Sequence, residues 1–129
     1  MRYLLDTVAV IRHLSGQWKI GNAAATILDN IGKQDDCLLV SVVSLMEIMY
    51  LAEKKRIPID LQETLRRIES SSKYMIVNLT PEILRVAQTV NFYELHDRLI
   101  LATAKWLDVP LISSDSKFAA VTGIRTIWD

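Results

Sequence analysis

The sequence predicts an α/β fold of three layers, in which helices cover both faces of a central, mainly parallel sheet of four to five strands. Short apolar runs typical of buried strands alternate with longer segments whose apolar residues recur at helical spacing. Strands separated by helices are joined by crossover connections, which make a sheet parallel. At 129 residues, 50% of them hydrophobic, the chain suffices for one core, so we expect a single domain over residues 1–129.

The first half of the chain is expected to hold two of the strands and their helices. Residues 3–5 form a strand that ends where Asp6 and Thr7 begin a helix. A second helix covers about residues 19–32, where apolar residues recur at helical spacing. Residues 37–40 form a continuous apolar strand, and residues 41–55 form a helix. Residues 60–70 form the next helix, because Asp60 and Glu63 have the spacing of a capping box.

The second half is expected to hold three more strands. Residues 74–79 form the third strand, and Thr80 and Pro81 begin a helix as its cap and first residue. The segment from Asp97 to Leu107 is apolar on nearly every side, which predicts a buried helix. Residues 110–113 and 125–128 complete the sheet.

Charge and cysteine content exclude several classes of protein. Lys and Arg, 15 in all, balance 15 Asp and Glu, so the chain lacks the basic field of a dedicated duplex-binding protein. A single cysteine, Cys37, excludes an internal disulfide and a cysteine-rich zinc site. No apolar run reaches the roughly 18 residues of a membrane span, and Asp6 interrupts any signal peptide. We therefore expect a cytoplasmic protein that has no membrane partner.

Four acidic residues stand near the ends of predicted elements. Asp6 follows the first strand, Asp115 follows the fourth, Glu47 lies early in the helix after the second, and Asp97 begins the most apolar helix. Loops after parallel strands gather at one edge of a sheet, and ligands bind where the strand order reverses. Carboxylates that meet there repel one another unless their pKa values rise or a cation joins them. Mg²⁺ and Mn²⁺ are the cations that prefer oxygen ligands.

Each of these acids also has a purely structural interpretation. Asp6, Asp97 and Asp115 stand where helix N-caps are expected, and Ser44 with Glu47 has the spacing of a capping box. For any one acid, the cap and the functional interpretation have about equal weight. Caps have no reason to congregate, so four acids at one edge of one sheet favour a site.

The motifs that contain these acids extend over essentially the whole chain. They are Leu4-Leu5-Asp6-Thr7, Ser44 with Glu47, His96-Asp97-Arg98-Leu99-Ile100 with Ala102-Thr103-Ala104, Ile112-Ser113-Ser114-Asp115 before Phe118, and Ile127-Trp128. Together they resemble the PIN domain family and, more narrowly, the VapC-type toxins of bacterial and archaeal toxin–antitoxin pairs.

What the resemblance implies is an endoribonuclease that hydrolyses RNA with Mg²⁺ or Mn²⁺. The catalytic residues would be Asp6, Glu47, Asp97 and Asp115. Asp6, Asp97 and Asp115 would hold the metal, directly or through water, and Glu47 would position water or a second ion. Thr7 and Ser113 match small hydroxyl positions that support the site. The resemblance also implies a homodimer and a small cognate antitoxin that covers the active site.

Other functions stay open at this point. A PIN-type module that only binds a partner and a stand-alone PIN nuclease without an antitoxin both have the same motifs. A metal-free ribonuclease would need His13 and His96 to meet, and nothing in the sequence brings them together. A phosphoacceptor receiver domain is excluded, because Leu79 and Thr80, not an acceptor Asp, follow the third strand.

Three surface features have two interpretations each. The clusters Lys54-Lys55-Arg56 and Arg66-Arg67 form either solvated helix faces or a rim for RNA phosphates. Arg98 either pairs with Asp97 or reaches a phosphate. The helix that contains Glu47 is apolar on more faces than one core contact needs, which predicts an interface with a second copy or with a partner.

Overall fold

The sheet has five strands in the order β3-β2-β1-β4-β5, and every neighbouring pair is parallel, which confirms the predicted fold class. The structure is a computed structural model that describes residues 1–32 and 35–129. Its strands are β1 (Arg2–Leu5), β2 (Cys37–Ser41), β3 (Tyr74–Val77), β4 (Leu111–Ile112) and β5 (Thr126–Ile127). Its helices are α1 (Thr7–Ser15), α2 (Asn22–Asn30), α3 (Val42–Glu53), α4 (Leu61–Ser70), α5 (Pro81–Ala87), α6 (Leu95–Leu107) and α7 (Ser116–Ala119).

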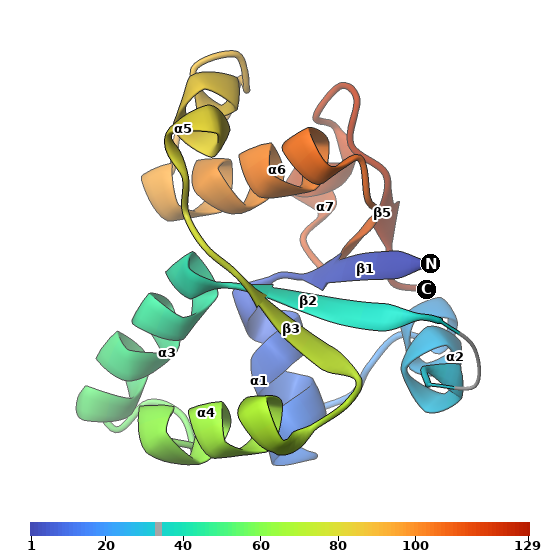
Figure 1. The fold of residues 1–129 in the computed structure, drawn as a ribbon, viewed down its shortest axis with the longest axis vertical. Coiled ribbons are helices and arrows are strands. Elements are labelled where there is room, and N and C mark those ends of the chain that lie inside the picture. Colours follow the sequence, from blue (N-terminus) through green and yellow to red (C-terminus); the bar gives the residue numbers. More distant parts are fainter. Residues whose placement is uncertain (33–34) are drawn as a thin grey trace.

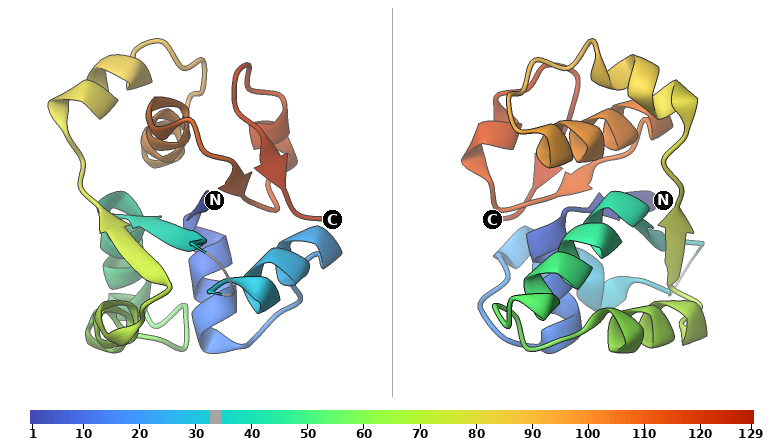
Figure 2. Two further views of the ribbon diagram at one scale, coloured as in Figure 1. Left: turned by 45° about the vertical axis from the view of Figure 1, so that its right-hand side comes forward. Right: turned by 90° about the vertical axis from the view of Figure 1, so that its left-hand side faces the viewer.

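Helices cover the sheet on both faces. In Figure 1, α5, α6 and α7 lie above the sheet, while α1, α3 and α4 lie below it, with α2 beside the ends of β1 and β2. Figure 2 shows the same division from two further directions. Strand residues alternate between the two faces, as a pleated backbone requires. Leu4 packs in the core under α6, and Leu5 packs in the core against α1.

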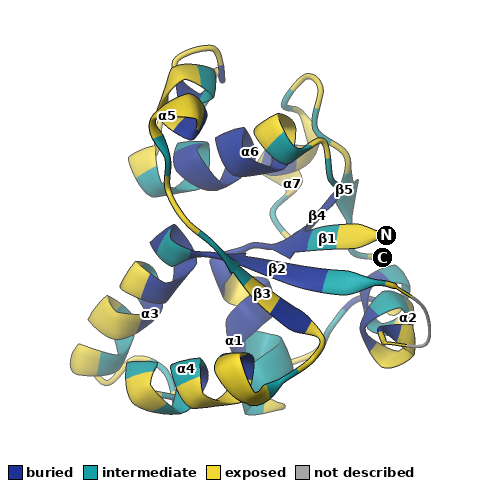
Figure 3. Cartoon of the chain, viewed as in Figure 1, coloured by how far each residue is buried: buried dark blue, intermediate teal, exposed yellow. Residues whose placement is uncertain are grey.

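Burial follows these layers. The middle turns of α6, from Leu99 to Ala104, are buried, as the sequence predicts for this helix (Figure 3). The outward surfaces of α3, α4 and α5 include many exposed residues (Figure 3). Within the two described ranges, no helix has the length and hydropathy needed to cross a bilayer.

Several helix boundaries differ from the prediction for local reasons. The second helix is shorter than expected: it begins after Gly21 and ends at Asn30, because the backbone of Ile31 is extended. The cap of α3 is Ser41, whose side chain accepts a hydrogen bond from the Val43 N–H, so the alternative interpretation of Ser44 and Glu47 as a capping box is wrong. The short helix α7 begins after Asp115, which confirms the interpretation of this residue as a helix N-cap.

The C-terminal segment returns to the start of α2. The Trp128 carbonyl accepts a hydrogen bond from the Ala24 N–H at 3.0 Å. A Cβ atom on Gly21 would stand 2.7 Å from Cδ1 of Trp128, which is closer than real Cβ contacts allow. The Arg12 guanidinium lies 5.6 Å from the centroid of the same indole. Glycine at position 21 therefore permits the docking of the chain's last strand beside α1 and α2.

Candidate active site

The candidate site lies at the edge of the sheet where the direction of strand order reverses. From β1 the chain proceeds through β2 to β3 on one side, and β4 then pairs with β1 on the other. The backbone N–H of Asp6, just after β1, donates to the Ile112 carbonyl at the end of β4, at 3.1 Å. This junction brings the loops after β1 and β4 together and is the place where open α/β sheets bind ligands.

Asp6 is buried at this junction, with 6% of its surface exposed. It caps α1, and its Oδ1 accepts a 2.8 Å hydrogen bond from the Ala9 N–H. Burial raises the pKa of Asp6 above its ordinary value. The hydrogen bonds from the Ser113 side chain and the Ala9 backbone oppose this rise, and the charges of Asp115 and Glu47 add to it. A buried carboxylate with two acidic neighbours is an electrostatically costly arrangement.

Glu47 is held from α1 by a hydroxyl. The Thr7 Oγ1–H donates to Glu47 Oε1 at 2.7 Å, and the same oxygen lies 3.0 Å from Ser44 Oγ. Thr7 and Ser44 are both buried. A hydroxyl has a single proton to donate, so Thr7 joins the two side chains of α3 and fixes one oxygen of Glu47. Thr7 thus orients Glu47 from α1, and Ser44 belongs to the same buried hydrogen-bond network.

Asp97 lies in the first turn of α6 and does not cap the helix. The cap is Glu94, which accepts hydrogen bonds from the backbone N–H groups of His96 (3.1 Å) and Asp97 (2.7 Å). Desolvation raises the pKa of Asp97 to about 6, with further contributions from the charges of Glu94, Glu47, Asp115 and Asp6.

Glu94 was missed in the sequence, since Asp, Asn, Ser and Thr are the preferred N-cap residues. Its position three residues before Asp97 was the only available signal. The helix-terminal N–H bonds hold the pKa of Glu94 below its ordinary value, against the opposing effect of its burial. Glu94 therefore remains charged beside Asp97 and adds a fifth carboxylate to this edge.

Asp115 and Ser113 occupy the loop after β4. Asp115 caps α7 by accepting a 2.9 Å hydrogen bond from the Lys117 N–H. The Ser113 hydroxyl oxygen accepts from the Asp115 N–H at 3.1 Å, and the same side chain hydrogen-bonds Asp6. Ser113 therefore connects the carboxylates that follow β1 and β4.

The structure thus separates the two interpretations of the four acids. Asp6 and Asp115 are helix caps, whereas Asp97 and Glu47 are not, although the charges of Asp6, Glu47 and Asp115 all act on Asp97. Within residues 1–32 and 35–129, none of the four has a Lys or Arg ion-pair partner. In the same ranges, no group of three or more acidic, His or Cys side chains is arranged so that it could hold a metal ion. The donor chemistry fits a hard divalent cation, and the side chains are arranged as an open, charged edge.

The other predicted polar groups fall elsewhere. His13 hydrogen-bonds the Tyr74 hydroxyl at the start of β3, whereas His96 lies 3.3 Å from Glu94 at the opposite end of the sheet. The histidines are therefore not brought together. Arg66 and Arg67 pair with Glu63 on the exposed side of α4, as a solvated helix face does. Arg98 forms no ion pair with Asp97.

These features define an α/β protein with a cluster of carboxylates at its topological switch point. The family model named PIN domain matches residues 3–124, and the chain belongs to the PIN domain family. No curated protein sequence matches the chain significantly.

Solved structures share the fold at low sequence identity. VapBC2 from Rickettsia felis, bound to a DNA fragment from its promoter, has a TM-score of 0.76 and 17% identity, covering 100% of both chains. DNA-bound VapBC from Salmonella typhimurium has a TM-score of 0.69 and 17% identity, covering 98% of this chain and 97% of that one. VapC20 from Mycobacterium tuberculosis, described as a toxin that cleaves the sarcin-ricin loop, has a TM-score of 0.62 and 14% identity, covering 95% and 98%.

Proposed function

We propose that this chain is an endoribonuclease that depends on Mg²⁺ or Mn²⁺ and is the toxin of a VapBC-type toxin–antitoxin pair. The catalytic residues are Asp6, Glu47, Asp97 and Asp115, with Thr7 and Ser113 in support. The proposal treats residues 1–129 as one nuclease domain that acts in the cytoplasm, where its RNA substrate is found.

The observation that carries the proposal is that the four carboxylates of the acidic edge, Asp6, Glu47, Asp97 and Asp115, have no Lys or Arg ion-pair partner within the described residues. Asp97 and Glu47 cap no helix, and burial together with the charges around Asp97 raises its pKa to about 6. Natural folds seldom keep repelling carboxylates without a function that needs them. A divalent cation relieves this repulsion, and structures of VapBC complexes share the fold.

The chain's own residues have separate tasks in this mechanism. A divalent cation, when bound, would activate a water and neutralise charge on the phosphoryl group. Asp6 and Asp97, on the rigid ends of β1 and α6, would hold the cation, and Asp115 would complete the oxygen ligands. Glu47, fixed by Thr7, would orient the attacking water. Because water attacks, and not the 2′-hydroxyl of the RNA, the products have 5′-phosphate and 3′-hydroxyl ends.

The antitoxin would bind the apolar surface of α3. Met46, Met49 and Tyr50 are exposed on this helix. They line a pocket with Glu47 and His96, and Met49 also lines an adjoining pocket against α4. A partner segment laid along α3 would therefore cover Glu47, one of the proposed catalytic residues. Binding of the antitoxin to the apolar surface of α3 would therefore also block the proposed active site.

The homodimer would use a different surface. Exposed apolar side chains also occur on β3, α5 and the start of α6, namely Met75, Leu84 and Leu95. Sedimentation of wild type and of Leu84→Glu tests this part of the proposal. A dimer that Leu84→Glu dissociates is the expected result, and a monomeric wild type at high concentration contradicts it.

RNA cleavage by the purified protein tests the nuclease. Wild type is incubated with labelled RNA in Mg²⁺, in Mn²⁺ and in EDTA, beside Asp97→Asn and Glu47→Gln. Glu53→Gln is the matched control, because Glu53 lies on the same helix as Glu47 but outside the acidic edge. We expect cleavage by wild type and Glu53→Gln only, only with metal, and with 5′-phosphate ends. Activity of Asp97→Asn equal to wild type contradicts the proposed site, and activity in EDTA contradicts the metal.

The alternative, a PIN-type module that only binds its partner, gives a different result. It would leave every RNA intact while the protein still binds its antitoxin through α3. Binding that Met49→Glu abolishes, together with no cleavage under any condition, would establish that alternative.

A further inference from the structure

A polar groove runs along α6 outside the acidic edge. Two pockets form it: one is lined by residues 88–93 and Arg98, and the next by residues 89–91 with Lys105 and residues 120–122. The two pockets share Thr89, Val90 and Asn91. None of these lining residues is acidic, and Arg98 and Lys105 are the charged ones. The groove therefore favours an anionic ligand.

Arg98 occupies one end of this groove without a partner. Its Nε–H is fully buried and donates to no hydrogen-bond acceptor in the described ranges, and the residue forms no ion pair there. A buried guanidinium N–H that is left unsatisfied costs free energy, and native proteins rarely keep one without reason. A phosphate oxygen is the acceptor that a guanidinium binds best.

Lys105 provides a second cation on the same side of α6. It follows Arg98 by seven residues, which is two helical turns, or about 10 Å along the axis. Its Nζ lies 3.4 Å from the Thr89 hydroxyl, in the middle of the groove. This separation is about the span of two nucleotides in a single strand. A sugar–phosphate backbone laid along α6 would therefore contact both cations.

We infer that the groove between α6 and residues 88–93 binds the backbone of single-stranded RNA, with Arg98 and Lys105 each contacting a phosphate. This inference rests on the proposed ribonuclease function and adds a substrate-binding track to it. Arg98 follows Asp97 directly, so the track begins beside the acidic edge and leads away from it.

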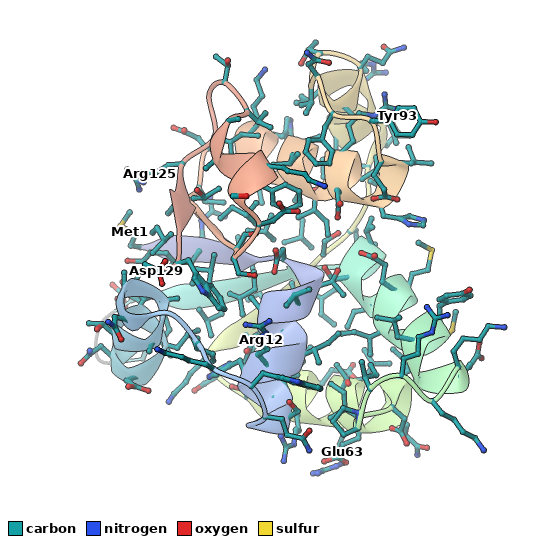
Figure 4. The ribbon with its side chains drawn as sticks, turned by 180° about the vertical axis from the view of Figure 1, so that it is seen from behind. Met1, Arg12, Glu63, Tyr93, Arg125 and Asp129 are labelled. Carbon is teal, nitrogen blue, oxygen red and sulfur yellow. The ribbon has the colours of Figure 1, made fainter. Side chains whose placement is uncertain are left out.

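Tyr93 adds an aromatic ring at the rim of the groove. Its side chain is fully exposed, at 102% of the reference area, and projects from the outside of the molecule (Figure 4). A fully exposed tyrosine contributes nothing to the core, whereas unstacked bases of single strands stack on such rings. Tyr93 is therefore placed to take one base of the bound strand.

Binding, measured apart from cleavage, tests the inference. Fluorescence anisotropy of a labelled 12-nucleotide single-stranded RNA is recorded in EDTA for wild type, Arg98→Met, Lys105→Met and Tyr93→Ala. Arg85→Met is the matched control, because Arg85 is exposed on α5 and outside the groove. Each loss of a phosphate contact should weaken binding about tenfold and lower the slope of log affinity against log salt by about 0.7. Tyr93→Ala should weaken binding about tenfold at an unchanged slope.

The outcomes separate the groove from the nuclease. If wild type cleaves RNA and neither Arg98→Met nor Lys105→Met changes the affinity or the salt slope, RNA binding by the groove is contradicted. The proposed ribonuclease function would still stand. If wild type neither binds nor cleaves RNA, both are overturned. A changed sedimentation coefficient of Arg98→Met with unchanged RNA binding assigns the groove to a contact between proteins and also overturns the inference. Lys105 and Tyr93 are exposed, so their variants remain informative even if Arg98→Met fails to fold.

Discussion

The Thr7 hydroxyl donates a 2.7 Å hydrogen bond to Glu47 Oε1, and this bond connects the first turn of α1 to the middle of α3. Thr7 directly follows Asp6, so one dipeptide supplies a buried carboxylate and orients a second one from another helix. The Asp-Thr pair at the end of β1 is therefore a structural unit as well as a sequence motif.

Replacing Thr7 should separate orientation from charge. Thr7→Val keeps the shape of the side chain and all the carboxylates, but releases Glu47. We expect RNA cleavage to fall about 10- to 100-fold, as for other residues that orient site ligands, and stability to fall by about 1 kcal/mol. Thr7→Ser keeps the hydroxyl and should retain most activity. Equal activity of the Val and Ser variants would show that Glu47 needs no support from α1.

Removing the charge of Asp97 should stabilise the metal-free protein. Its pKa rises from 3.8 to about 6 on folding, so ionisation above pH 3.8 costs stability until the group is fully charged near pH 7. The rise corresponds to about 3 kcal/mol, and partial exposure to water reduces this to about 1 kcal/mol. Urea unfolding in EDTA should therefore show Asp97→Asn more stable than wild type at pH 7 and equal to it at pH 4. A less stable variant at pH 7 would mean that Asp97 is a structural residue.

Acid should weaken the contact between α1 and β3. Burial lowers the pKa of His13, although the charge of Asp29 opposes this effect, so the folded state favours the neutral ring. Stability that depends on neutral His13 is fully present above the unfolded pKa of about 6.5 and is lost as the pH falls below it. His13→Gln should be about 1 kcal/mol less stable than wild type at pH 7.5. The difference between the two proteins, taken from unfolding curves, should shrink toward pH 5. A constant difference over this range would rule out a titrating His13.

Gly21 should tolerate no side chain. A Cβ atom there would collide with the Trp128 backbone and with its Cδ1 atom at 2.7 Å. Because the obstacle includes backbone, Gly21→Ala should lower stability by about 2 kcal/mol or more. Asn22→Ala, at the exposed neighbouring position, is the control and should stay within about 0.5 kcal/mol of wild type. Thermal unfolding of both variants measures the contrast, and equal melting temperatures would show that the C-terminal segment is free to move aside.

Helix caps that depend only on residues close together in the sequence were predicted correctly. Thr80 caps α5 and Asp60 caps α4, as the sequence indicates, because each capping side chain and the backbone N–H that donates to it are close in the chain. For α3, Ser41 and Ser44 are both suitable cap residues, and local spacing left the choice between them open. Their choice depends on where β2 ends, and pairing with β3 extends β2 to Ser41. That pairing is a long-range property which local spacing does not contain.

The part of the candidate site that follows from the order of the parallel strands could be predicted from the sequence. Asp6 and Asp115 were expected to meet because parallel strands end at a common edge, and the charge of Asp115 does act on Asp6. The surroundings of Asp97 were not predictable in the same way. Glu94 is a poor cap by residue type, and the direction of Arg98 depends on how residues 88–93 pack against α6. These properties come from tertiary packing.

The pairing of β1 with β4 also determines when the acidic edge can form during synthesis of the chain. A ribosome makes β1 first, but Asp6 gains its neighbouring strand, its Ser113 hydrogen bond and the Asp115 charge only when residues 111–115 have emerged. A growing chain that already contains Asp6, Glu47 and Asp97 has no β4 to complete the acidic edge. The acidic edge of a growing chain therefore stays incomplete until β4 has paired with β1.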